Sequence, residues 1–207
     1  MSRSLDSLVS VIVSSAGPPR ADRIPAGLTG GAEHRELLSR HDGFIAFEGG
    51  LRCFGTNAQL VPSLSDWNRP EGWRSAYGML TEGLLFFAED AFGNQFGFQE
   101  GRIVRFLAET ADREGMADSL EEWIETLLAD PDEELSLWLL RAWKRPDRVL
   151  EPGDHLCPKV PFVAGGVYEP DNLYPLARHK SMVFKGDFAL QTRHVPDGGK
   201  IRFKVTD

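Results

Sequence analysis

Residues 84–106, LLFFAEDAFGNQFGFQEGRIVRF, predict three consecutive strands of an antiparallel sheet. Residues 84–88 form an unbroken apolar run of strand length, as expected of a strand that is buried on both faces. Phe96 and Phe98 are two positions apart, so on the second strand they share one face. Gln99-Glu100-Gly101 suits a tight turn, because Gly101 tolerates a positive φ. The third strand follows at residues 103–106.

Shorter patterns outside this meander predict a helix and a hairpin. Residues 33–41 suit a helix that Gly43 stops, and residues 44–47 and 51–54 suit two strands joined at Gly49-Gly50, a two-residue hairpin signal. Residues 4–14 fit either an amphipathic helix or a strand, with the helix favoured by the apolar spacing.

The strongest helix signal lies at residues 118–130. Ser119 and Glu122 have the spacing of a capping box, and an apolar stripe follows at positions i, i+3, i+4, i+7 and i+8. Pro131 allows a break, after which Asp132 is placed to cap a second helix at about residues 133–144. Residues 147–207 are rich in Pro and Gly, with a last strand expected at residues 201–205.

These elements predict an α+β fold: a twisted, mainly antiparallel sheet with helices packed on one face, plus a C-terminal extension. We expect a domain at residues 1–131 and an extension or subdomain at residues 132–207. One buried core is expected, made by Leu85, Phe87, Phe96, Phe98, Val104, Leu120, Trp123, Ile124 and Leu127.

The order of these motifs resembles the SUKH superfamily of Smi/Knr-type proteins. The pattern A-E-D-x-x-G-N-x-F-x-F-x-x-G-x-I-x-x-F at residues 88–106 is similar to the central motif of that family. His41-Asp42-Gly43-Phe44 is similar to its helix-ending H-N-G step, with Asp42 where Asn is common, and residues 118–130 match the helix after the meander. The resemblance covers about residues 25–130 and implies protein binding, which in bacteria is commonly the neutralisation of a toxin by an immunity protein.

The charge distribution bears on the kind of partner. Residues 82–135 carry 15 acidic and 3 basic residues, a net charge of −12, against 0 for residues 1–81 and +4 for residues 136–207. Such a block repels nucleic acid and attracts a basic protein surface, for example that of a nuclease toxin. A solvated acidic face that only maintains solubility is the alternative interpretation.

Candidate partner-binding residues follow from this block and from a Trp-bearing polar stretch at residues 62–78. The acidic candidates are Glu89, Asp90, Glu100 and Glu114. Trp67 and Trp73 are candidate aromatic anchors if they are exposed, whereas the alternative is that both cover the sheet. Glu89 and Asp90 are neighbours and therefore point to opposite faces of a strand, so Asp90 is interpreted as a turn former rather than as half of an acid–base pair.

Residues that suggest catalysis or metal binding are few. His155 and Cys157 would share a face of a strand, which is the geometry of a thiol hydrolase, but a buried structural cysteine is the favoured interpretation. The five histidines are scattered, and Cys53 and Cys157 have no C-x-x-C spacing, so no metal site, cofactor or disulfide framework is expected. The lone cysteines and the absence of a signal or spanning segment predict a cytoplasmic protein that contacts no membrane.

We therefore expect a non-enzymatic module that binds a protein, with a toxin domain as the expected partner. A housekeeping scaffold and a Cys/His hydrolase are the rival interpretations.

Overall fold

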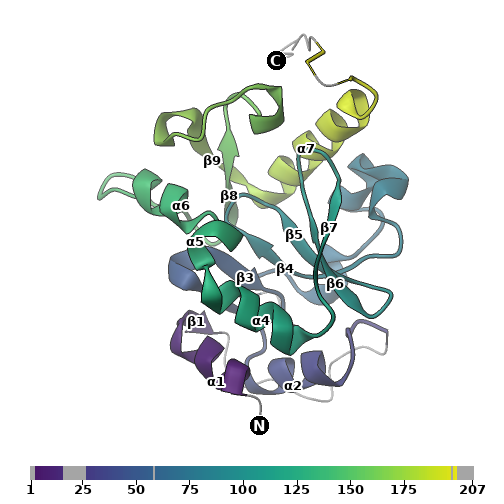
Figure 1. Cartoon of the computed structure of the whole chain (residues 1–207), viewed down its shortest axis with the longest axis vertical. Helices are drawn as coiled ribbons and strands as arrows, with labels where there is room; N and C mark the ends of the chain where they lie inside the picture. The colour runs from purple at the N-terminus through teal and green to yellow at the C-terminus, as the bar shows by residue number, and fades with distance from the viewer. Residues whose placement is uncertain (1–2, 16–26, 58, 197, 200–207) are drawn as a thin grey trace.

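The computed structural model describes residues 3–15, 27–57, 59–196 and 198–199, and it confirms the predicted α+β class. A seven-stranded antiparallel sheet follows the chain in the order β1 to β7, and β8 and β9 pair in a separate small sheet (Figure 1). The strands are β1 (Ile12–Ser15), β2 (Phe44–Ala46), β3 (Leu51–Cys53), β4 (Leu85–Asp90), β5 (Gln95–Gln99), β6 (Arg102–Phe106), β7 (Arg113–Ala117), β8 (Asp154–Pro158) and β9 (Leu173–Ala177).

The predicted meander is confirmed as β4, β5 and β6. Gln99 pairs with Arg102 across a two-residue turn, in which Glu100 and Gly101 both have positive φ angles, of 50° and 84°. Two positive φ angles define the primed turn whose twist matches that of the flanking strands. The Gly49-Gly50 hairpin was predicted less accurately, because β2 and β3 are separated by four residues that include the short 3₁₀ turn η2 (Phe47–Gly49).

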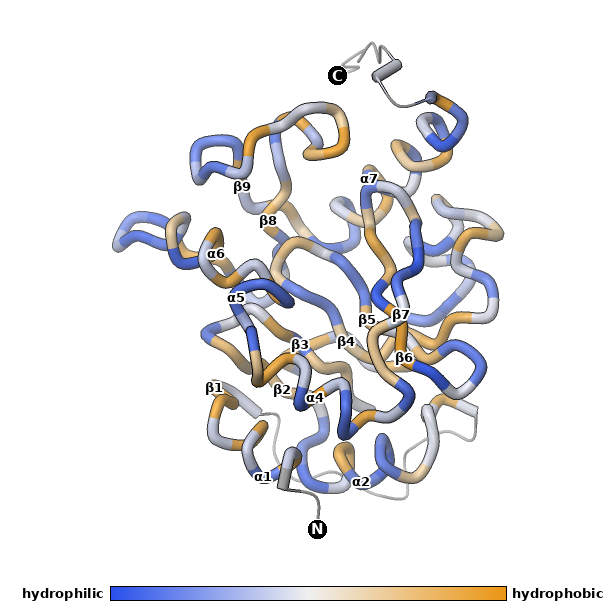
Figure 2. Tube along the Cα trace, in the orientation of Figure 1, coloured by the Kyte–Doolittle hydropathy of each residue, from blue (hydrophilic) through white to orange (hydrophobic). Residues whose placement is uncertain are grey.

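One face of the sheet is covered by α4 (Leu120–Ala129), with α1 (Arg3–Ser10) and α2 (Ala32–Arg40) packed against that helix (Figure 1). Trp123 of α4 is fully buried, and its ring meets those of Phe87 and Phe96 edge-on at 5.0 and 5.3 Å. Seven of the nine predicted core residues are buried in one cluster, whereas Leu85 and Phe98 are only partly buried. In Figure 2, orange segments of the tube mark hydrophobic residues of β4 and β6.

The opposite face is covered by α3 (Leu64–Trp67), by the 3₁₀ turns η3 (Trp73–Ala76) and η4 (Gly78–Thr81), and by the C-terminal helix α7 (Arg178–Thr192). Trp67 and Trp73 are 5% and 1% exposed, so their assignment as exposed anchors is wrong and the alternative, that both cover the sheet, is confirmed. Each indole N–H has an internal acceptor, Gln95 Oε1 at 2.7 Å for Trp67 and the Trp67 carbonyl at 3.0 Å for Trp73. Because each indole N–H has an acceptor, both rings can be buried although their neighbours in the sequence are polar.

Ser119 caps α4 as predicted, whereas the reciprocal bond of Glu122 goes to the residue before the cap. Ser119 Oγ accepts a hydrogen bond from the backbone N–H of Glu122 at 3.1 Å, and the Glu122 carboxylate accepts one from the N–H of Asp118 at 2.8 Å. The second helix is divided into α5 (Pro131–Glu134) and α6 (Leu137–Trp143) because Ser136 adopts a left-handed conformation. Asp130, rather than the predicted Asp132, caps α5.

The C-terminal extension contains β8, β9, α7 and the 3₁₀ turns η5 (Phe162–Ala164) and η6 (Pro170–Asn172). Helix α7 packs closely on η3 at Gly186, where a Cβ atom would lie 2.8 Å from the Tyr77 ring and 2.9 Å from Ala76. The sequence did not predict this helix, and the strand expected at residues 201–205 lies outside the described residues. None of the helices in the described ranges has the length and apolar content that crossing a bilayer requires.

Candidate functional site

A buried charge cluster forms where the main sheet meets the C-terminal extension. Glu89, at the end of β4, has no exposed surface and lies between groups that come from distant parts of the chain. Its carboxylate lies 3.0 Å from His155 Nε2 on β8, 3.0 Å from Arg178 Nη1 on α7 and 3.8 Å from Arg52 Nη1 on β3. Burial alone would raise the pKa of Glu89, but His155, Arg178 and Arg52 outweigh it and hold the pKa at about 2.

His155 connects this cluster to two potential nucleophiles. Its Nδ1 lies 3.1 Å from Ser181 Oγ, and Cys157 Sγ donates a hydrogen bond to the same Ser181 Oγ at 3.0 Å. Carboxylate, imidazole and hydroxyl groups are thus in the order used for nucleophilic catalysis. Burial lowers the pKa of His155 to about 4, so the ring is neutral at pH 7. Glu89, His155, Cys157 and Ser181 are all 0% exposed, which leaves a substrate no direct access to the row.

Sequence reasoning considered His155 and Cys157 but missed Glu89 as their partner and missed Ser181 entirely. No local pattern identifies this set, since Glu89 and Ser181 are far from His155 along the chain. The prediction that Glu89 is a surface contact for a partner is wrong, because its side chain is sealed against three internal groups.

Asp90 is also buried, at 3% exposure, so its assignment to a partner surface is wrong as well. Asp90 Oδ1 accepts hydrogen bonds from the backbone N–H groups of Phe92 at 2.8 Å and Asn94 at 2.9 Å, and Oδ2 accepts one from the Asn94 side chain. This geometry confirms Asp90 as the former of the β4–β5 turn. In the β3–β4 register, Glu89 lies opposite Arg52 and Asp90 lies opposite Leu51, so the two neighbouring carboxylates have different contacts.

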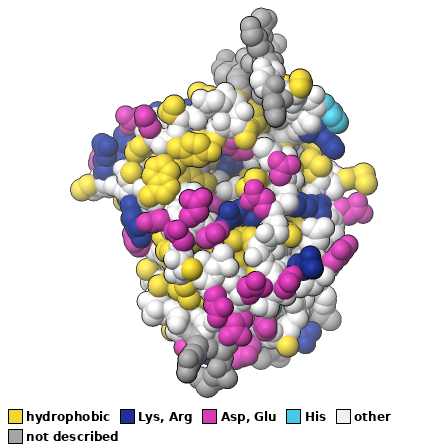
Figure 3. Space-filling view, in the orientation of Figure 1, with side chains coloured by type: hydrophobic (Ala, Val, Ile, Leu, Met, Phe, Trp, Pro, Cys, Tyr) yellow, Lys and Arg dark blue, Asp and Glu magenta, His cyan; other side chains and the backbone are white. Residues whose placement is uncertain are grey.

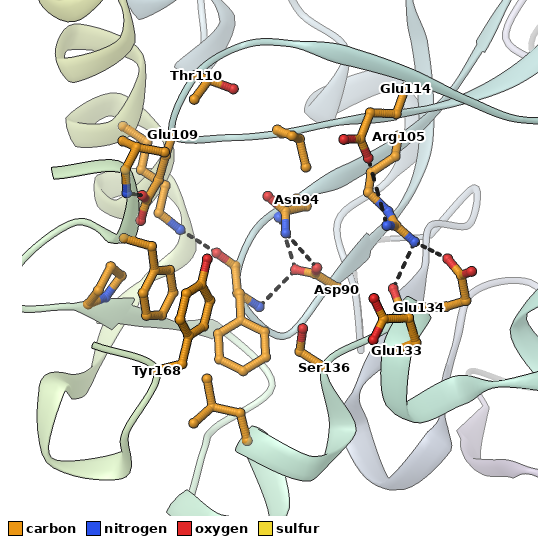
Figure 4. Close-up of a pocket in the computed structure, with 17 residues that line it drawn as sticks. Asp90, Asn94, Arg105, Glu109, Thr110, Glu114, Glu133, Glu134, Ser136 and Tyr168 are labelled. Atoms are coloured by element: carbon orange, nitrogen blue, oxygen red, sulfur yellow. Dashed lines mark hydrogen bonds and ion pairs between the residues drawn. The ribbon is translucent and has the colours of Figure 1, made fainter. Parts of the chain in front are cut away.

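An acidic cleft of about 380 Å³ lies beside the turn that Asp90 forms (Figure 4). In Figure 4, Glu109 and Tyr168 stand at one end of it, Arg105, Glu114, Glu133 and Glu134 stand at the other, and Asp90 and Asn94 lie between them. Phe92, Leu107, Thr110, Ser136, Leu139, Pro158, Phe162, Val163 and Lys185 complete its lining.

The two cations of the cleft are both engaged within the protein. Arg105 pairs with Glu134 and, at 3.9 Å, with Glu114. Lys185 is 3% exposed and donates a hydrogen bond to the carbonyl of Phe92. The cleft therefore has an acidic character that its own basic groups offset only in part.

Exposed carboxylates continue from the cleft over β7, α4 and α5. We call this surface the acidic face, and its members are Glu114, Asp118, Glu121, Glu122, Glu125, Asp130 and Glu133. They appear as magenta side chains over α4 and its surroundings in Figure 3. Of the candidates named from the sequence, Glu114 belongs to this face, and Glu100 is exposed at the tip of the β5–β6 hairpin without lining the cleft.

The described residues contain no group of three or more His, Cys, Asp or Glu side chains arranged to hold a metal ion. Cys53 and Cys157 are free and buried.

Comparison with known proteins gives a fold relationship. No protein-family model matches the chain, and no curated protein matches it. The crystal structure of Atu4351 from Agrobacterium tumefaciens is similar, with a TM-score of 0.58 and 15% sequence identity over 90% of this chain and 89% of that chain. At this identity the likeness shows that the two chains share a fold along nearly their whole lengths.

Proposed function

We propose that this protein is a non-enzymatic binding module that captures a basic protein through its acidic face. The partner we favour is a toxin domain, in particular a nuclease, which this chain would neutralise as an immunity protein by covering its active site. The resemblance of residues 88–106 to the SUKH motif supports the same function.

The observation that carries this proposal is the contrast between the exposed carboxylates and the buried residues that could support catalysis. Seven carboxylates of the acidic face are exposed, whereas the residues with catalytic chemistry, such as His155 and Ser181, have no exposed surface. Asp118 pairs with Arg102 and Glu114 with Arg105, but the remaining carboxylates leave this face with a net negative charge, which accelerates encounter with a surface of opposite sign and repels nucleic acid. We place the protein in the cytoplasm, where two free cysteines persist without a disulfide.

The rival function is a hydrolase that uses Glu89, His155 and Ser181 or Cys157. It requires the C-terminal extension to move away from β4 to admit substrate, and such a movement would break the contacts of Glu89 with His155 and Arg178. A scaffold without a toxin is the third function, and it differs from the first only in the identity of the partner.

The test is to express the protein encoded beside this gene, alone and together with this chain. We expect the neighbouring product to stop growth when expressed alone, and we expect co-expression to restore growth and to yield a stable complex. The double variant Glu114→Lys, Glu125→Lys should lose protection, whereas the matched pair Glu71→Lys, Glu151→Lys, exposed elsewhere, should keep it. A harmless neighbouring product, or equal protection by both double variants, would refute the proposal.

A further inference from the structure

The acidic cleft has features that a solvated acidic surface does not need. It is a hollow of about 380 Å³ between the β4–β5 and β6–β7 connections, the α5–α6 junction and η5 of the extension. That volume is at the lower end of the range for small-molecule sites and is sufficient for one long side chain.

The charges of the cleft are unbalanced. Five lining carboxylates face two cations, a net charge of −3 when all are ionised. Arg105 is paired with Glu114 and Glu134, and the buried Lys185 donates to a backbone carbonyl. Among the residues that the structure describes, Glu109 and Glu133 have no ion-pair partner within 4 Å, and Lys185 offsets the charge of Glu109 only from a longer distance, so carboxylate remains available at both ends of the cleft.

Glu109 is fixed toward an aromatic wall. Its Oε2 accepts a hydrogen bond from the backbone N–H of Val163 at 3.2 Å. Val163 directly follows Phe162 in the sequence, so this bond holds the Glu109 carboxylate beside the segment that carries the Phe162 ring. Burial raises the pKa of Glu109, a cost to the ionised form that an incoming cation would offset. Phe162 stacks on Tyr168 with ring centroids 4.1 Å apart and an interplanar angle of 2°. Tyr168 is 58% exposed, so this wall is accessible from solvent.

We propose that the cleft receives the guanidinium group of an arginine side chain from the protein partner. The guanidinium would stack on the Phe162–Tyr168 wall and pair with the Glu109 carboxylate. Arginine fits better than lysine, because its planar group both stacks on aromatic rings and presents two parallel donors to a carboxylate. This inference rests on the proposed function, since it names a contact through which the basic partner would be held after the acidic face has steered it.

The probe is the capped tripeptide acetyl-Gly-Arg-Gly-amide, titrated into the 207-residue chain and followed by amide chemical shifts. The matched control peptide replaces arginine with citrulline, which has nearly the same shape and no charge. We expect the arginine peptide to shift the amide signals of Thr110 and Val163, and we expect the citrulline peptide to bind at least tenfold more weakly. Glu109→Gln should weaken binding of the arginine peptide about tenfold and Tyr168→Ala about fivefold, whereas Glu151→Gln, remote from the cleft, should leave it unchanged.

Equal binding of the two peptides, or shifts confined to residues outside the cleft, would overturn the inference. Tyr168 is largely exposed, so its variant keeps the test valid if Glu109→Gln disturbs η5. Arginine-dependent binding in the cleft, together with a neighbouring gene product that this chain does not bind, would support the cleft and refute the proposed toxin partner. Protection by this chain with no response to the arginine peptide would support the function and refute the cleft.

Discussion

Replacing Glu89 with Gln tests whether the buried charge cluster holds the extension to the sheet. The substitution keeps the shape of the side chain but removes the negative charge that faces Arg52, Arg178 and His155. The pKa of Glu89 falls from 4.5 to about 2 in the folded protein, which corresponds to about 3 kcal/mol in favour of its ionised form. Independently of the pKa, removal of one partner from a buried ion pair lowers the free energy of unfolding by about 3–5 kcal/mol, because the other charge stays buried without a partner.

The assay is urea unfolding followed by tryptophan fluorescence at pH 6 and at pH 8. The pKa of Glu89 is lowered, so its contribution is complete above about pH 4.5 and is lost as pH falls toward 2. We therefore expect Glu89→Gln to lower the free energy of unfolding by about 3–5 kcal/mol at both pH values. Glu71→Gln, an exposed control, should change it by less than about 0.5 kcal/mol. A loss below about 1 kcal/mol, the value of a surface pair, would refute the reasoning.

Four further outcomes are expected. Trp123→Ala should lower the free energy of unfolding by about 3–5 kcal/mol in urea titrations, because a fully buried indole leaves a cavity, and an unchanged midpoint would contradict this. Burial lowers the pKa values of His34 and His155 from 6.5 to about 4. As pH falls, these histidines are therefore protonated in the unfolded chain before they are protonated in the folded protein. These two rings should together lower the stability by about 5 kcal/mol between pH 7 and 4.5, offset in part by Asp90 and Glu109, whose pKa values burial raises, and a stability that rises over this range would exclude neutral buried rings. The free energy of unfolding of Cys157→Ser should lie within about 1.5 kcal/mol of the wild-type value, since the hydroxyl keeps the contact with Ser181. Rapid labelling of the native protein at Cys157 by a thiol reagent would show instead that this residue is accessible. Glu114→Lys should slow association with a basic partner more than it speeds dissociation. Stopped-flow association rates that do not change with salt concentration would count against steering by the acidic face.

Local patterns were sufficient for the elements whose stability is local. The apolar run of β4, Gly101 in the β5–β6 turn and the helix cap at Ser119 each specify backbone geometry within a few residues. The sequence left the position of the two tryptophans open, because the polar loop around them suggests exposure and their size suggests burial. Burial depends instead on acceptors such as the Gln95 side chain, 28 positions from Trp67.

Helix α7 was missed for a different reason. Its inner face includes Arg178, Ser181, Lys185 and Gly186, which interrupt the apolar period that marks a buried helix. Each has a non-local role: Arg178 and Ser181 complete the cluster around Glu89 and His155, Lys185 donates to the Phe92 carbonyl, and Gly186 admits Tyr77. A helix that buries polar residues to satisfy distant groups is not predictable from its own sequence.

The same non-local contacts determine whether the acidic cleft exists. Its lining comes from the β4–β5 turn and β6 on one side, and from η5 and α7 of the extension on the other. Arg178 and Lys185 lie on α7, two turns of helix apart, so the helix that supplies a counter-charge to Glu89 also carries the ammonium group beside the cleft. Loosening the buried cluster should therefore widen the cleft and separate Glu109 from the β4–β5 turn. We expect destabilising substitutions at Glu89 to weaken binding of the arginine peptide, although Glu89 does not line the cleft.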